Sequence, residues 1–273
     1  MLETVKYQNH LGEEINFSES GIYVKSSDLH DYAWNYTERG GKITSFKRNV
    51  ISKKIDLAIA CATEAAGIQK RNDLVECFEK DVLAKQPGKI FVNGYYLKCY
   101  VTASSKSKYL DSMKTMLVSL ELLSDEPFWV KEVEATYVRD STTNELTGII
   151  NPLDHEANFR LTIFGSTTET TISIGGAIHG LSYGLEANTQ LVIDSITKEV
   201  YVLKNGKKNN AFSKRYVSYI SGSAGTMVGG VIKGVLVDDT FKKIPSGNST
   251  IGRSESFQWS LILYDERSEP KWI

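Results

Sequence analysis

Apolar and polar residues alternate along most of this chain, in short runs that are separated by turn residues. A period of two residues is typical of half-buried β-strands. The second half shows it in five runs: FRLTIFG, TTISIGG, TQLVID, KEVYVLKNG and SFQWSLILYDE. Because these runs are short and evenly spaced, the pattern predicts a β-sandwich or barrel for this half.

Turn residues between alternating runs predict β-hairpins in the first half. In GKIFVNGYYLKCYV, Asn93 and Gly94 supply the two positive-φ positions that a two-residue type I′ turn requires. Gly40 and Gly41 separate two further alternating runs, which predicts a second hairpin near residues 32–48. This second hairpin carries the aromatic residues Trp34, Tyr36 and Phe46.

One segment follows a helical period instead. Its apolar residues recur at spacings of about seven, three and four residues: Ile68, Val75, Phe78 and Val82. The spacing predicts a helix over residues 63–83, with these four side chains on one face that packs across a sheet. Thr63 can cap the start of this helix.

The polar stretch from Asp140 to Glu145 interrupts the strand pattern and predicts a loop or linker. We place a domain boundary near Thr136, which gives a helix-bearing β domain at residues 1–136 and an all-β domain at residues 137–273. A chain of 273 residues, 41% of them hydrophobic, can form two cores of medium size.

The charges of the chain nearly cancel, with 32 basic and 33 acidic residues. No net field would draw the chain to nucleic acid or to an anionic membrane, so a contact with DNA would depend on shape. No apolar run reaches the length of a membrane span, and the first residues lack the features of a secretion signal. The three cysteines lie far apart in apolar stretches, where we expect them to be reduced and buried.

No catalytic, metal or cofactor motif stands out in the sequence. The four histidines are scattered, without the spacing of metal ligands. Ser221–Gly225 lacks the leading glycine of a nucleophile elbow, and residues 225–234 lack the Lys-Ser/Thr pair of a phosphate-binding loop. The sequence therefore predicts a protein that is not an enzyme and binds no cofactor or metal.

A weak candidate for a sugar site consists of His155, Asn158 and Arg160, the residue types with which galectins bind galactose. The spacing here is H-x-x-N-x-R, one residue longer than the galectin pattern. Alternation along one strand therefore cannot bring all three side chains to one face. A carbohydrate-binding adhesion module that recognises host cell-wall glycans is the alternative function.

The chain closes with YDERSEPKWI, residues 264–273, in which charged residues surround a proline and a tryptophan. Pro270 restricts the backbone, as suits a tail that docks into a defined groove, while a frayed polar end is the simpler interpretation. The candidate docking residues are Arg267, Pro270 and Trp272.

Ordered segments of the chain resemble the distal tail protein (Dit) family of long-tailed siphophages and their prophages. They are GEEINF, GIYV, DYAW, ITSFKR, FEKDVLAKQPGKIFVNGYYLKCYVT and DEPFWVKE in the first half, and FRLTIFG, LVIDSITKEVYVL, FKKIPSGNSTI and ERSEPKW in the second. The resemblance implies a mainly β fold: an N-terminal β-sandwich with one α-helix, and a C-terminal galectin-like β-sandwich. The length corresponds to members without an inserted carbohydrate-binding module.

The resemblance also implies a structural role at the virion tail tip, after assembly in the bacterial host cytoplasm. A hexameric ring would join the tail tube protein to the tail-associated hub protein and to receptor-binding or baseplate proteins. Double-stranded DNA would pass through it without specific binding. The hairpin near residues 32–48 would clasp the next subunit through Trp34, Tyr36 and Phe46. The glycine-rich residues 218–237 depart from the family pattern and are predicted to form an extra loop, on a neighbour or on the surface.

Overall fold

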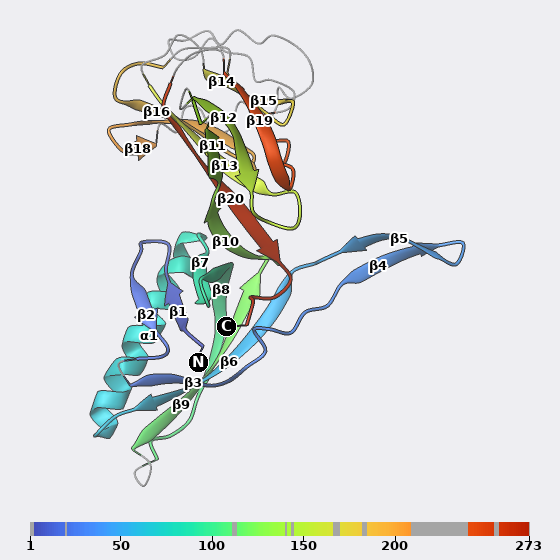
Figure 1. Ribbon diagram of the computed structural model, residues 1–273. Helices are drawn as coiled ribbons and strands as arrows, with labels where there is room; N and C mark the ends of the chain where they lie inside the picture. Colours follow the sequence, from blue (N-terminus) through green and yellow to red (C-terminus); the bar gives the residue numbers. More distant parts are fainter. Residues whose placement is uncertain are drawn as a thin grey trace. The chain divides into compact units, whose positions relative to one another are not determined.

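The chain folds into two compact units. The computed structural model describes residues 3–19, 21–110, 114–139, 141–142, 145–165, 170–181, 185–208, 240–253 and 257–272. Unit 1 comprises Met1–Lys131 and Glu266–Ile273, and unit 2 comprises Glu132–Asp265 (Figure 1). The glycine-rich residues 218–237 lie outside the described residues.

This division differs from the sequence-based boundary in two ways. The chain passes from unit 1 to unit 2 after Lys131, ahead of the expected position at Thr136. Glu266–Ile273 belong to unit 1, whereas the tail 264–273 was expected in the second domain. The alternation pattern reports only which side of a strand is buried, so it carries no signal for a chain end that returns to the first unit.

Unit 1 is a β-sandwich with one helix. Its first layer has the strand order β2-β1-β7-β8, and its second layer has the order β3-β6-β9-β8. The long strand β8 takes part in both: its first part pairs with β7, its later part with β9, and the register shifts between Val101 and Ala103. The elements are β1 (Val5–Gln8), β2 (Glu14–Asn16), β3 (Ile22–Ser27), β4 (Asn35–Arg39), β5 (Lys42–Lys47), β6 (Ile51–Ala60), α1 (Glu64–Ala84), β7 (Gly88–Val92), β8 (Tyr95–Lys106), β9 (Thr115–Ser124) and β10 (Trp129–Glu134).

The β7–β8 hairpin turns at Asn93 and Gly94, whose φ values are 51° and 83°. Positive φ at both positions is what a type I′ turn requires, so this prediction is confirmed. The turn fixes the register of the two strands, which puts Val92 opposite Tyr95.

The helix α1 begins after Thr63, whose side chain accepts a hydrogen bond from the backbone N–H of Ala66. Its buried residues are Gly67, Leu74, Cys77, Phe78 and Asp81. Of the four residues predicted for the buried face, only Phe78 is among them, and Ile68 and Val82 are exposed. The prediction of the face is therefore wrong, because a glycine and an aspartate occupy buried positions and give no hydrophobic signal.

A buried polar cluster connects α1 to the first hairpin. The Tyr7 hydroxyl donates to Asp81 Oδ2 at 2.5 Å, and the backbone N–H of His10 donates to Asp81 Oδ1 at 2.8 Å. Both Tyr7 and Asp81 are fully buried. Burial and the Asp81 hydrogen bond raise the pKa of the Tyr7 hydroxyl well above its ordinary value. The hydroxyl stays protonated as a donor, which satisfies a carboxylate that has no access to water.

Unit 2 is an all-β sandwich. Its layers have the orders β18-β17-β16-β13-β20 and β11-β12-β19-β14-β15. Alternate residues of both layers enter one core, among them Phe159, Leu161 and Ile163 from one layer and Ile172 and Ile174 from the other. The strands are β11 (Thr136–Arg139), β12 (Leu146–Asn151), β13 (Asn158–Phe164), β14 (Thr170–Ile174), β15 (Ala177–Leu181), β16 (Thr189–Asp194), β17 (Glu199–Lys204), β18 (Lys207–Lys208), β19 (Gly247–Arg253) and β20 (Trp259–Arg267). The mainly β fold class is confirmed.

Candidate assembly surfaces

The β4–β5 hairpin of unit 1 is exposed along its whole length. Every residue of β4 and β5 is exposed. Among the described strands these two pair only with each other, and the hairpin extends away from the remaining strands of its unit (Figure 1). Gly40 and Gly41 have φ values of 62° and 74°, which a tight turn needs and which glycine adopts without strain. The predicted hairpin is thus an arm without a core of its own.

One face of this arm is apolar. Tyr36 lies directly opposite Phe46, so the two side chains share a face, and they are 60% and 59% exposed. The register shifts after Thr37, and this irregularity puts Ile43 opposite Glu38. Ile43 therefore joins the side of the hairpin that carries Phe46, although simple alternation would place it on the other. We call Tyr36, Ile43 and Phe46 the apolar face of the arm.

The base of the arm is an aromatic cluster around an arginine. The Trp34 ring lies edge-on to Phe46 and Phe128, with centroid distances of 6.4 and 5.9 Å. The Arg48 guanidinium lies 5.6 Å from the Trp34 centroid and 5.2 Å from that of Phe128, a cation–π arrangement. Burial lowers the pKa of Arg48. Its Nε is buried and has no hydrogen-bond partner within the described part of the chain.

The C-terminal residues lie against unit 1. The Trp272 ring stacks on His30 at 3.8 Å with an interplanar angle of 13°, although the side chain is 72% exposed. The Asn93 side chain donates to the Lys271 carbonyl at 3.2 Å. Arg48 Nη1 donates to the Ser268 carbonyl at 3.5 Å.

Two of the three candidate tail residues lie in this ordered segment. Pro270 is buried, and Trp272 makes the stack with His30. Arg267 is the last residue of β20. The tail therefore contacts its own chain, and docking into a groove of a partner stays a prediction.

The three residues of the candidate sugar site do not lie on one strand. Asn158 and Arg160 lie two apart on β13 and share a face, whereas His155 precedes the strand. Asn158 Oδ1 accepts a hydrogen bond from Ser195 at 3.1 Å. Arg160 Nη2 donates to Glu132 at 2.9 Å. Two of the polar groups that a sugar would need are thus already used within unit 2.

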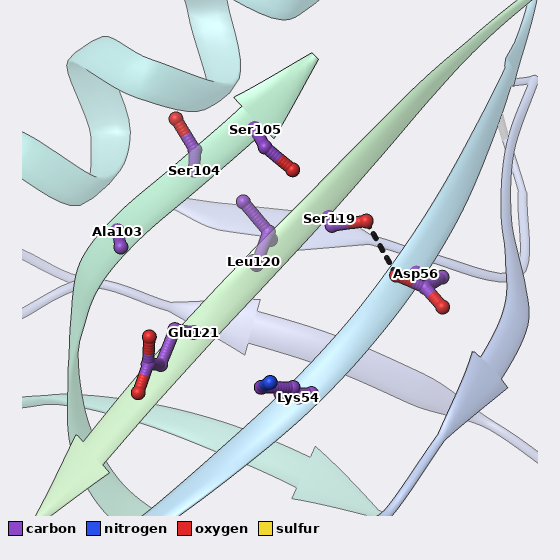
Figure 2. A pocket seen from close by; sticks show the side chains of 8 residues that line it. All are labelled: Lys54, Asp56, Ala103, Ser104, Ser105, Ser119, Leu120 and Glu121. Carbon is purple, nitrogen blue, oxygen red and sulfur yellow. Dashed lines mark hydrogen bonds between the residues drawn. The ribbon is translucent and has the colours of Figure 1, made fainter. Parts of the chain in front are cut away.

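A shallow pocket of about 420 Å³ lies on the outer face of β6, β8 and β9 (Figure 2). The Asp56 carboxylate accepts hydrogen bonds from Ser119 at 2.5 Å and from Ser26 at 2.7 Å. These two hydrogen bonds lower the pKa of Asp56. Lys54 lies opposite Glu121 on the neighbouring strand. The lining residues include no histidine or cysteine.

Three residues of the arm and its base were not predicted from the sequence. Ile43 was missed because the irregularity in register is not visible in the alternation pattern. Arg48, which follows β5, and Phe128, which precedes β10, were missed because they are distant in sequence and contact each other and Trp34 only in the folded chain. The position of Arg48 directly after a hairpin rich in aromatic residues could have predicted a cation–π contact.

No group of three or more His, Cys, Asp or Glu is arranged to hold a metal ion in the part of the chain that the structure describes. No described helix combines the length and the apolar character needed to cross a membrane.

The fold is similar to those of solved phage proteins. No protein-family model and no curated protein sequence matches the chain. Among solved structures, a chain of the phage p2 baseplate in its activated conformation with Ca aligns with a TM-score of 0.63 and 8% identity, over 99% of this chain and 100% of that one. The corresponding structure with Sr gives 0.61 and 8%, over 99% and 100%.

The Dit protein of phage SPP1 is also similar, and it is described as a paradigm of the hub adsorption apparatus in phages that infect Gram-positive bacteria. It aligns with a TM-score of 0.54 and 10% identity, over 98% of this chain and 100% of its own. These alignments cover both units. The chain therefore has the fold of the distal tail proteins over nearly its whole length, as the sequence resemblance predicted.

Proposed function

We propose that this chain is a distal tail protein, a structural subunit of the tail tip of a long non-contractile phage or prophage. The observation that carries the proposal is the fold likeness to a phage baseplate chain and to a Dit protein, which covers 99% and 98% of this chain. Ordered sequence segments in both halves support the same assignment.

In this proposal six copies form a ring at the virion tail tip. Contacts between two different patches of each subunit close such a ring. The exposed arm is a suitable first patch, because every residue of its two strands is exposed, including those of its apolar face. Aromatic residues dominate the buried centres of interfaces, which makes Trp34, Tyr36 and Phe46 the candidate anchors.

The ring would join the tail tube protein to the tail-associated hub protein and to receptor-binding or baseplate proteins. Double-stranded DNA would pass through its centre, and a formal net charge of −1 gives no general attraction for the phosphates. Assembly in the host cytoplasm suits the three buried free cysteines.

Electron microscopy of the purified full chain, alone and mixed with the tail tube protein of the same phage, tests this function. We expect rings with an open centre, and stacks of ring and tube in the mixture. Particles of single-subunit size in both samples would contradict the proposal.

A further inference from the structure

A second pocket, of about 400 Å³, lies in unit 2 at one end of the layer β18-β17-β16-β13-β20. Four segments border it: the end of β13, the start of β16, the turn between β17 and β18, and the residue that precedes β20. Small-molecule sites have volumes of about 300 to 1,000 Å³ and combine apolar surface with a few convergent polar groups. The pocket has the size of such a site.

Four residues with side-chain amides line this pocket, namely Asn188, Gln190, Asn205 and Gln258. None of these side chains hydrogen-bonds to another residue that the structure describes. Each amide offers two N–H donors and an oxygen acceptor. The described lining residues include no charged side chain. The pocket therefore presents unused donors and acceptors together, without a charge that would select an ion.

Apolar side chains accompany the amides on the outer face of the sheet. Phe164 lies opposite Gln190, and Gln190 lies opposite Leu203, so the three form one row across β13, β16 and β17. Their chain neighbours Ile163 and Leu191 belong to the core of unit 2, so the row lies on the face away from it. Phe164 and Leu203 are half-buried. They flank the Gln190 amide with apolar surface that the core does not use.

Backbone contacts fix the walls of the pocket. Asn205 and Gly206 have φ values of 53° and 73°, as the two central residues of a type I′ hairpin turn have. The backbone N–H of Gly165 donates to the Thr189 carbonyl at 2.9 Å. An added Cβ at Gly165 would lie 2.3 Å from the Glu186 carbonyl oxygen, so the end of β13 packs closely against the segment that leads into β16. The site is thus formed by ordered backbone.

We propose that this pocket binds a neutral hexose. Each hydroxyl group of a sugar both donates and accepts hydrogen bonds, which matches the paired donors and acceptors of the amides. The C–H face of the sugar ring would pack on Phe164 and Leu203. The proposal goes beyond the tail-tip role and does not depend on a ring. The site is also distinct from the candidate sugar site, since Arg160 lies four residues before Phe164, about 13 Å along β13.

Saturation-transfer difference NMR on the full chain tests the site, with glucose and galactose as probes. We expect transfer to at least one hexose, and binding at least about tenfold weaker after Gln190→Leu with Gln258→Leu, because two hydrogen bonds are lost. Gln69→Leu on α1 is the matched control and should bind as the unmodified chain does. A thermal melt checks that the double variant is folded, and Gln258→Leu alone replaces it if it is not.

Three results overturn the inference: no transfer to either hexose, unchanged binding in the folded glutamine variant, or binding that Arg160→Leu removes. Glucuronate and the neutral peptide acetyl-trialanine amide are the controls for other ligand classes. Binding of either one as strongly as the hexose also overturns the assignment. Maltotriose distinguishes the source of a glucose ligand: binding tighter than that of glucose indicates a unit of a polysaccharide and equal binding a free sugar, and both results support the pocket.

Discussion

At the scale of single residues, a fully buried carboxylate holds the first hairpin to the end of α1. Asp81 binds Tyr7 and His10, which are 74 and 71 positions away in the chain. No local pattern in the sequence predicts this cluster, because each partner has an ordinary polar residue type. The cluster of Asp81, Tyr7 and His10 is tightly packed, and Gly88 lies directly against it.

Gly88→Ala is expected to destabilise unit 1 by about 1 to 3 kcal/mol. A methyl group at this position would lie 2.3 Å from both Asp81 Oδ2 and the Tyr7 hydroxyl, so the cluster would have to move. Urea denaturation measures the change in the free energy of unfolding. Gly252→Ala is the control, since its nearest contact is Ser173 Cβ at 3.6 Å. Equal stability of the two variants would contradict the packing described here.

Stability is also expected to fall in alkaline solution. Burial raises the pKa of the Cys99 thiol from 9.0 to about 12. Between these pH values the thiol loses its proton in the unfolded chain but keeps it in the folded chain. The contribution of Cys99 to the free energy of unfolding is therefore complete below pH 9 and is lost as the pH rises toward 12. In this range Cys99 lowers the free energy of unfolding by up to about 1.4 kcal/mol per pH unit.

Denaturation at pH 8 and pH 10 measures this slope. Cys99→Ala is expected to lower the stability at both values but to make the dependence on pH shallower. Cys77, whose pKa burial raises to about 11, contributes in the same direction in both proteins. Identical slopes for the variant and the unmodified chain would show that the Cys99 thiol is not protected as described.

At the scale of elements, substitutions in the arm are expected to change assembly but not the stability of unit 1. Tyr36→Ala combined with Phe46→Ala removes two exposed rings that contribute nothing to the core of unit 1. We expect the melting temperature to stay nearly unchanged, because exposed substitutions usually change stability by less than about 0.5 kcal/mol. We expect oligomers to be lost, because aromatic anchors each contribute about 2 kcal/mol or more.

Light scattering together with a thermal melt measures both effects for the arm. The control is Thr37→Ala on the opposite face, which should leave the oligomers intact. Intact oligomers in the double variant would contradict the role of the arm.

Elements defined by local signals were predictable from the sequence. The turns at Gly40-Gly41 and Asn93-Gly94 use residues that adopt positive φ easily, and the structure has them there. The buried face of α1 was not predictable in this way. Gly67 packs so closely that an added Cβ would lie 2.6 Å from Cys61 Sγ. Asp81 is buried where residues distant in the chain bind its carboxylate. Ile68 and Val82, which the pattern assigned to the core, are instead exposed.

At the scale of the whole molecule, the chain returns to unit 1 at its end. Trp272 stacks on His30, and Asn93 binds the Lys271 carbonyl. From the sequence, Pro270 and Trp272 suited either a docking tail or a frayed end. The location of the tail depends on residues far away in the chain, for which the sequence carries no local signal.

Trp272→Ala is expected to destabilise unit 1 by about 0.5 to 1.5 kcal/mol, the usual contribution of an aromatic pair. It should also speed proteolytic cleavage within residues 266–272. Lys271→Ala is the control, because it retains the carbonyl that Asn93 binds. Equal cleavage rates in both variants, measured by mass spectrometry of the peptides, would contradict the stacked arrangement.

The proposed ring assembles through unlike patches of neighbouring copies. Native mass spectrometry of the purified full chain over a range of concentrations measures its oligomeric state. We expect a single dominant species with the mass of a hexamer, which the double substitution at Tyr36 and Phe46 reduces to monomers. A monomer that persists at the highest concentration would rule out the ring.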